Sequence, residues 1–184
     1  MVTIAPILTL EEFLQRPESK PGEEFIDGRI SAKPMPQGKH SRLQFKLCQA
    51  IAEVAESQQL AGVFPELRCT FGGVSLIPDI AIVRWGDIPR DAAGEVANQF
   101  KFAPPWAIEI LSPGQSQTKV LENLLYCAAH GTELGWLVHP AEASILTVFE
   151  DQRVQVFRND RPLPVLPELD LCLTTTQIFN WLTI

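Results

Sequence analysis

The chain has 184 residues, of which 46% are hydrophobic and 20% are charged, a composition typical of one globular domain with a full core. No apolar run reaches the roughly 20 residues of a membrane helix, so we expect no membrane partner. The net charge of −7 argues against a protein that coats nucleic acid through bulk electrostatics.

The four cysteines are scattered along the chain and form neither a C-x-x-C pair nor a zinc-like spacing: Cys48, Cys69, Cys127 and Cys172. We therefore expect reduced, mostly buried thiols in a cytoplasmic protein. A structural metal cluster built on cysteine is not expected.

The first third of the chain predicts one short helix, a hairpin and one long helix. Thr9 begins the short helix, and Glu12 completes a capping box with it. Residues 24–30 predict a hairpin that turns at Asp27-Gly28. Residues 41–58 carry apolar side chains at helical spacing, which indicates an amphipathic helix.

The middle of the chain predicts buried strands around an irregular segment. Residues 62–71 and 74–83 are expected to form two strands, with Asp79 inside the second. Residues 84–105 predict a long loop with one short helix at most. A buried strand over 106–111 carries Glu109, and a helix over 116–129 follows it.

The last third predicts strands at 134–138, 144–149 and 152–157 and a closing helix at 174–182. The whole pattern predicts an α/β fold in a single domain, residues 1–184, with a mixed central β-sheet flanked by α-helices. The strands after Gly135 would leave sheet edges, and a homodimer is one way of covering them.

Two acids stand out because each lies in an apolar run. Asp79 is surrounded by isoleucine, alanine and valine, and Glu109 lies between Ile108 and Ile110. A charge in such a run is unfavourable unless it is paired or binds a cation. If the two strands are neighbours, both carboxylates converge, and Glu24 from the hairpin could be a third.

Carboxylate oxygens favour Mg²⁺ or Mn²⁺ over zinc. Such an ion polarises a phosphoryl oxygen and lowers the pKa of an attacking water, which supports phosphodiester hydrolysis. A nearby lysine usually completes a site of this kind. The alternative interpretation is a pair of structural acids bonded to arginine or to the backbone.

Several motifs in order along the chain resemble one family. They are Thr9-x-Glu11-Glu12-Phe13-Leu14, Glu24-x-Ile26-Asp27-Gly28, Pro36-x-x-x-His40-Ser41, Pro78-Asp79-Ile80-Ala81, Ile108-Glu109-Ile110-Leu111-Ser112-Pro113 and Gly135-Trp136-Leu137-Val138-x-Pro140. The chain is similar to the Uma-two-type endonucleases, a bacterial family of the restriction-endonuclease-like PD-(D/E)xK superfamily. The resemblance implies a nuclease fold, a metal site of Asp79 and Glu109 with Glu24 nearby, and DNA as substrate. Fold alone does not fix that function.

The lysine of the superfamily motif is missing from its expected place, which is Leu111 here. In the family the lysine has moved to the following helix, and the matching position is Asn123, which is uncharged. Lys119 lies one helical turn before Asn123 and is the candidate replacement, unless it is an ordinary exposed lysine. Gln115 and Gln117 in the preceding turn could position water or phosphate.

The segment from Gly28 to Ala52 contains five lysines and arginines and no acid, so this face could meet phosphates. His40, at the start of the long helix, could touch a phosphate or could simply cap or pack. The leading hypothesis is a metal-dependent DNA endonuclease. The alternatives are a catalytically degenerate nuclease fold that binds nucleic acid or protein, and a dimeric structural protein.

Overall fold

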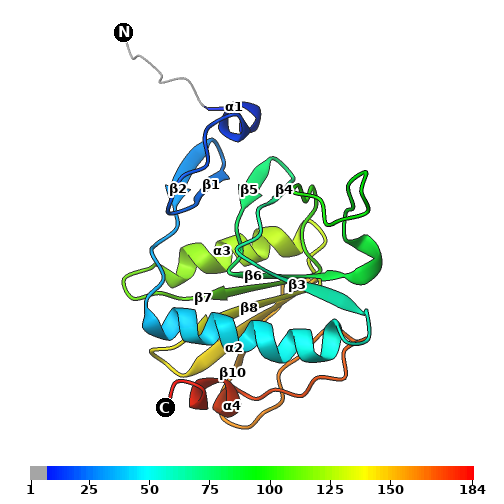
Figure 1. The fold of residues 1–184 in the computed structure, drawn as a ribbon. Coiled ribbons are helices and arrows are strands. Elements are labelled where there is room, and N and C mark those ends of the chain that lie inside the picture. Colours follow the sequence, from blue (N-terminus) through cyan, green and yellow to red (C-terminus); the bar gives the residue numbers. More distant parts are fainter. Residues whose placement is uncertain (1–7) are drawn as a thin grey trace.

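The structure is a computed structural model that describes residues 8–184, and its main sheet has six strands (Figure 1). These strands are β3 (Ala61–Pro65), β6 (Ile80–Arg84), β7 (Trp106–Ile110), β8 (Leu134–His139), β9 (Ser144–Phe149) and β10 (Val154–Phe157). Their order is β10-β9-β8-β7-β6-β3, and the β7–β8 pair is parallel while its neighbours are antiparallel. The expected mixed sheet is thus confirmed.

Helices cover both faces of this sheet (Figure 1). One face packs against α2 (Gly38–Ala55) and α4 (Thr175–Asn180), and the other packs against α3 (Gln117–Ala128). Strand β7 supplies both cores by alternation, because Trp106, Ile108 and Ile110 face α2 whereas Ala107 faces α3. Helix α3 also makes the crossover that a parallel β7–β8 pair requires.

A smaller sheet stands beside the main one and is formed largely by the N-terminal part of the chain (Figure 1). Its strands are β1 (Glu23–Ile26), β2 (Arg29–Ala32), β4 (Cys69–Phe71) and β5 (Val74–Leu76), in the order β2-β1-β5-β4. Asp27 and Gly28 adopt φ values of 49° and 74°, the left-handed turn expected for a two-residue hairpin. The predicted hairpin is therefore confirmed.

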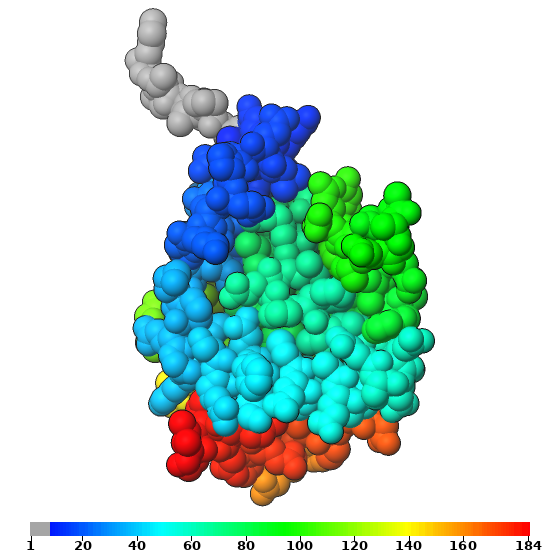
Figure 2. All heavy atoms as spheres, viewed as in Figure 1, coloured from blue at the N-terminus to red at the C-terminus, as the bar shows by residue number. Residues whose placement is uncertain are grey.

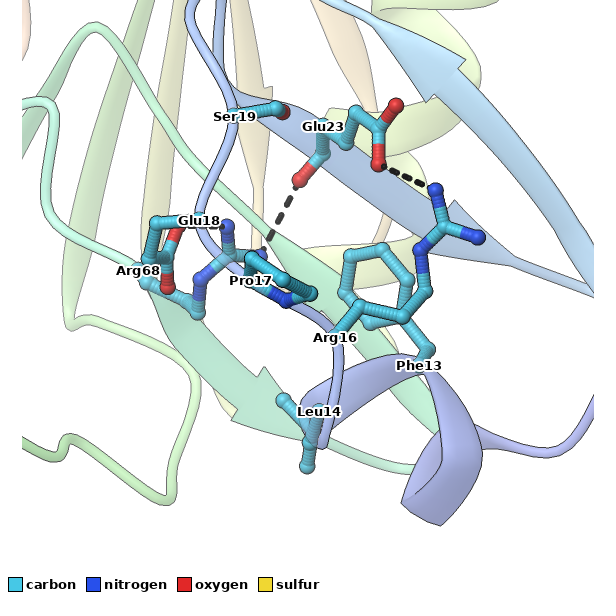
Figure 3. A pocket seen from close by; sticks show the side chains of 8 residues that line it. All are labelled: Phe13, Leu14, Arg16, Pro17, Glu18, Ser19, Glu23 and Arg68. Atoms are coloured by element: carbon cyan, nitrogen blue, oxygen red, sulfur yellow. Dashed lines mark hydrogen bonds and ion pairs between the residues drawn. The ribbon is translucent and has the colours of Figure 1, made fainter.

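Helix α1 (Leu10–Leu14) is fastened to this small sheet, with the predicted Thr9–Glu12 capping box in place. Phe13 stacks on Phe25 with ring centroids 5.4 Å apart. Figure 3 shows the Arg68 guanidinium next to Glu18, 2.9 Å away, while its other nitrogen donates to the main-chain oxygen of Glu23 at 3.1 Å. These contacts occupy the small pocket drawn there and fix the position of β1.

Two strands predicted as continuous are each divided. Residues 62–71 form β3 and β4, and residues 74–83 form β5 and β6, which belong to different sheets. The second division falls at Pro78-Asp79, because proline has no N–H to donate to a ladder. Asp79 therefore lies at the entrance of β6 and not inside a strand, which corrects the prediction.

Other expectations hold with shifted ends. The loop 84–105 contains one short 3-10 helix, Trp85–Asp87, and α2 begins at Gly38, three residues before the predicted start. The four cysteines are free thiols, two of them buried. Among residues 8–184, no helix is long and apolar enough to cross a bilayer.

The space-filling view places α2 across one face, between the N-terminal hairpin at one end and the C-terminal segment at the other (Figure 2). Strands β3 and β10 form the two edges of the main sheet. The homodimer expected from such edges stays a prediction.

Helix α2 offers a test of the core. Leu47 is fully buried against the sheet, whereas Phe45 on the same helix is 61% exposed. We expect Leu47→Ala to lower the free energy of unfolding by about 2–5 kcal/mol because it leaves a cavity. The matched control Phe45→Ala should change it by less than about 1 kcal/mol. Equilibrium urea unfolding measures both, and equal losses would contradict this packing.

Candidate active site

Asp79 and Glu109 meet because β6 and β7 are adjacent. Ile80 pairs with Ile108 in antiparallel register, so one step further Asp79 lies opposite Glu109. Directly opposed residues of an antiparallel pair point to the same face. The predicted convergence of the two carboxylates therefore follows from the sheet register.

At Pro78, where the pairing of β6 with β7 stops, the Asp79 side chain accepts a hydrogen bond from the β7 backbone. In the continued register Pro78 would stand opposite Ile110. The Ile110 N–H instead donates to Asp79 Oδ2 at 2.7 Å. Asp79 thus takes the role of a ladder acceptor, and its carboxylate is fixed at the sheet end.

Further contacts hold Asp79 from the side of α2. His40 Nε2 lies 3.0 Å from Asp79 Oδ2, and Gln44 Nε2 donates to the Asp79 main-chain oxygen at 2.9 Å. The Glu66 N–H donates to the same main-chain oxygen at 3.1 Å. Only 4% of Asp79 is exposed, so both its backbone and its carboxylate are held in one geometry.

The cation that meets both acids is Lys33, at the end of β2. Its Nζ lies 2.7 Å from Asp79 Oδ1 and 3.1 Å from Glu109 Oε2. It also donates to the Ile77 main-chain oxygen at 2.6 Å. Three oxygen atoms therefore converge on one positive charge, two from the connection between β5 and β6 and one from β7.

Glu24 lies beside this cluster without touching the ammonium group. Its Oε1 accepts from the Ile77 N–H at 2.9 Å, and the residue is 7% exposed. Glu24 thus lies near Asp79 and Glu109, as the resemblance implied. Its carboxylate ties β1 to the segment that leads into Asp79.

One lysine cannot neutralise three buried carboxylates, and the pKa values reflect this. Burial, together with repulsion from Asp79 and Glu24, raises the pKa of Glu109 well above its usual value. Burial also raises the pKa of Glu24. Although burial acts the other way, hydrogen bonding from His40 and attraction to Lys33 lower the pKa of Asp79 to about 2. The carboxylates around Lys33, above all Glu109, outweigh its burial and raise its pKa. The cluster therefore holds a proton on Glu109 or Glu24 more tightly than free acids would, and it would need a further cation for all three acids to be ionised.

A cleft of about 880 Å³ opens between the hairpin and α3, and Lys33 and Glu24 lie in its wall. Lys119, Asn123 and Gln115 line the same cleft, and the catalytic role expected of Lys119 stays a prediction. Lys119 is exposed and, within residues 8–184, forms no ion pair with either acid. Gln115 Oε1 accepts from the Ser112 N–H at 3.0 Å and so shapes the loop. Gln117 begins α3 and lies outside the residues that line the cleft.

Lys33 is the site residue that sequence reasoning missed. It was recognised only as one member of the acid-free basic segment. Its partners lie 46 and 76 residues further along the chain, and no local pattern connects positions so far apart. The weak signal available was a lysine followed by Pro34, where the chain leaves a hairpin.

The donor set suits a hard divalent cation. Such ions take carboxylate and carbonyl oxygens, and Asp79, Glu109 and Ile77 aim oxygens of these kinds at the point where the Lys33 ammonium lies. Within the described residues, no three His, Cys, Asp or Glu side chains are arranged to hold a metal together. Only two side-chain ligands therefore converge, and a carbonyl joins them.

Comparison with known proteins identifies the family of the chain. The model of the Uma2 family, described as putative restriction endonuclease, matches residues 10–176. The chain belongs to this family. A crystal structure described as a putative nuclease from Anabaena variabilis ATCC 29413 is 47% identical and superimposes with a TM-score of 0.93. The match covers 95% of this chain and 99% of that one. Among curated proteins no relative was found.

Lys33 and a divalent cation should compete for the same carboxylate oxygens. Lys33→Met leaves buried acids without their counter-charge, which should lower the free energy of unfolding by about 3 kcal/mol at neutral pH. Added Mn²⁺ should raise the melting temperature of this variant more than that of the wild type, because the ammonium no longer competes for the same oxygens. Thermal unfolding with and without Mn²⁺ measures both effects. Lys119→Met is the control and should shift stability by less than about 1 kcal/mol.

The raised pKa of Glu109 predicts a pH dependence. The folded protein binds this proton more tightly than the unfolded chain, so ionising Glu109 destabilises the metal-free protein as the pH rises from about 4.5 through the raised pKa. A cation offsets that charge beside Asp79, Glu24 and Lys33. The gain in melting temperature from Mn²⁺ should therefore grow as the pH rises from about 4.5 through the raised pKa.

Glu109→Gln supplies the control for this pH dependence. The amide carries no titrating charge, so the variant should gain little from Mn²⁺ at any pH in that window. A gain in the wild type that is independent of pH would contradict the assignment of the shift to Glu109.

Proposed function

We propose that this protein is a divalent-cation-dependent nuclease that hydrolyses phosphodiester bonds of DNA, with Mg²⁺ or Mn²⁺ as the cation. The observation that carries the proposal is the convergence of Asp79 and Glu109 on the Lys33 ammonium, and Lys33 lies in the wall of an open cleft. Membership of the Uma2 family and the nuclease-like neighbour support it.

The acids of this site would hold the ion, and Ile77 offers a carbonyl oxygen beside them. A bound Mg²⁺ or Mn²⁺ polarises a phosphoryl oxygen and lowers the pKa of a water molecule. Asp79 is kept ionised by His40 and Lys33, and it is oriented by His40 and by the Ile110 N–H. The pKa of Glu109 is raised in the metal-free cluster, so Glu109 would release its proton when it takes up the ion.

Lys33 is the residue to which we assign the role of the missing motif lysine. Leu111 and Asn123 carry no charge, and Lys119 is not in contact with the acids. Lys33 reaches both of them from a flexible stem in the cleft wall. A phosphate that enters the cleft adds negative charge, and the Lys33 ammonium stabilises the further charge that develops in the transition state.

A second candidate function is favoured by the same lysine. Because Lys33 already pairs with Asp79 and Glu109, the cluster could remain closed to cations and serve a degenerate fold that binds DNA or protein without cutting. This candidate predicts binding that does not depend on a divalent cation. The raised pKa of Glu109 favours the nuclease, because full ionisation of the three acids requires a cation besides Lys33.

A cleavage assay tests the proposal. Supercoiled, linear and single-stranded DNA are incubated with Mg²⁺ or Mn²⁺ and the full chain. We expect metal-dependent cleavage, and a loss of about 10²–10³-fold in rate for Asp79→Asn and for Lys33→Gln, because each removes a group that acts on the transition state.

Lys119→Gln is the matched control for Lys33→Gln and should retain most of the rate. If Lys119→Gln removes cleavage while Lys33→Gln does not, the catalytic lysine is Lys119. Full activity in Asp79→Asn would overturn the nuclease proposal, and wild-type binding without cleavage would favour the degenerate fold.

A further inference from the structure

A second cleft adjoins the acid cluster on the side of α2. It is lined by the start of α2 (residues 37–40), by the loop of residues 111–115 after β7, and by residues 139–141 after β8. Gly114 and Gln115 belong to the walls of both clefts. His40 lines this second cleft and also bonds to Asp79. A nucleic-acid strand that passes Lys33 in the first cleft could therefore continue over Gly114 and Gln115 into the second.

The N-terminus of α2 opens into this second cleft without a side-chain cap. Gln37, the N-cap residue, forms no capping hydrogen bond, and the first turn contains no acid. The first amides of an 18-residue helix therefore present partial positive charge there. Lys39 lies in the same turn and lines the cleft. The sequence from Gly28 to Ala52 has no acid that would repel an anion.

His40 supplies an independent sign of a missing ligand. It is 7% exposed, and its Nε2 is engaged by Asp79. Its other ring nitrogen, Nδ1, is buried and has no hydrogen-bond partner. A buried polar atom without a partner is unfavourable and needs an explanation. Because Nε2 donates to the ionised Asp79, Nδ1 of the neutral ring accepts, and a water that donates to both Nδ1 and a phosphate oxygen would give it a partner.

We propose that this second cleft binds a backbone phosphate of the nucleic acid, next to the phosphate that reacts at Asp79 and Glu109. The α2 amides, the Lys39 ammonium and His40 Nδ1 form the phosphate subsite. This proposal rests on the proposed nuclease function, and it adds the path that the nucleic-acid strand takes over the protein surface. His40 then has two separable roles, holding Asp79 through Nε2 and contacting the phosphate through Nδ1 and one water.

The test uses short labelled DNA duplexes in which one phosphate at a time is replaced by an uncharged methylphosphonate. Fluorescence anisotropy with Ca²⁺ gives the affinity of the full chain for each duplex. We expect the wild type to lose about tenfold at one position beside the cleavage point, the size of one charged hydrogen bond. In Lys39→Gln the same replacement should have little effect, because the contact is already gone.

Salt dependence gives a second reading of the same contact. The slope of log affinity against log salt concentration should fall by about 0.9 in Lys39→Gln, as expected for one phosphate contact. Lys46→Gln is the control, because Lys46 lies on the same helix but bonds to Gln49 and is absent from the cleft wall. Its slope and its methylphosphonate profile should match the wild type.

Two substitutions of His40 separate its roles. Gln can place an amide donor near the position of Nε2, so His40→Gln should keep the stabilisation by Mn²⁺ and lose the methylphosphonate effect. Asn places its polar group near Nδ1, so His40→Asn should do the reverse. Thermal unfolding confirms that each variant is folded.

The possible results separate failure of the phosphate subsite from failure of the nuclease function. If the wild type cleaves DNA and all variants keep the wild-type methylphosphonate profile, the subsite is refuted and the nuclease function stands. If the wild type neither binds nor cleaves DNA with any cation, the nuclease function fails and the subsite fails with it.

Discussion

The site depends on a single ammonium group placed among three buried carboxylates. Lys33 contacts Asp79 and Glu109, and Glu24 lies close enough to alter its pKa. Each acid would be strongly unfavourable in this position without a cation. Lys33 alone does not balance three ionised carboxylates, so the pKa values of Glu109 and Glu24 are raised, and a divalent ion would supply the charge that full ionisation requires.

The elements around the cluster are arranged by one backbone interruption. Pro78 lies between β5 of the small sheet and β6 of the main sheet, and it prevents β6 from beginning earlier. The chain therefore enters the main sheet just after Asp79. The freed Ile110 N–H is then available for the Asp79 carboxylate. A residue that breaks a strand has thus created the hydrogen bond that orients the acid, and the local irregularity marks the functional site.

The sequence predicted the features that are encoded locally. Helical spacing located α2 and α3, the Asp27-Gly28 turn located the hairpin, and period-two alternation placed Glu109 on one face of β7. The division of residues 74–83 between two sheets could not be seen, because a run of apolar residues is compatible with one strand or two. Lys33 was missed for a related reason: its contacts depend on how two sheets pack, which no spacing within one element records.

The absence of lysine at position 111 also has a packing reason. Leu111 is 9% exposed and joins the apolar core beneath α3, where it packs with Val120 and Leu137. A lysine there would need to leave that core or bury its charge in it. Lys33 reaches the same acids from the hairpin, outside the α3 interface. What the chemistry constrains is the position of the charge in space, so the element that supplies the lysine can change while the acids stay on β6 and β7.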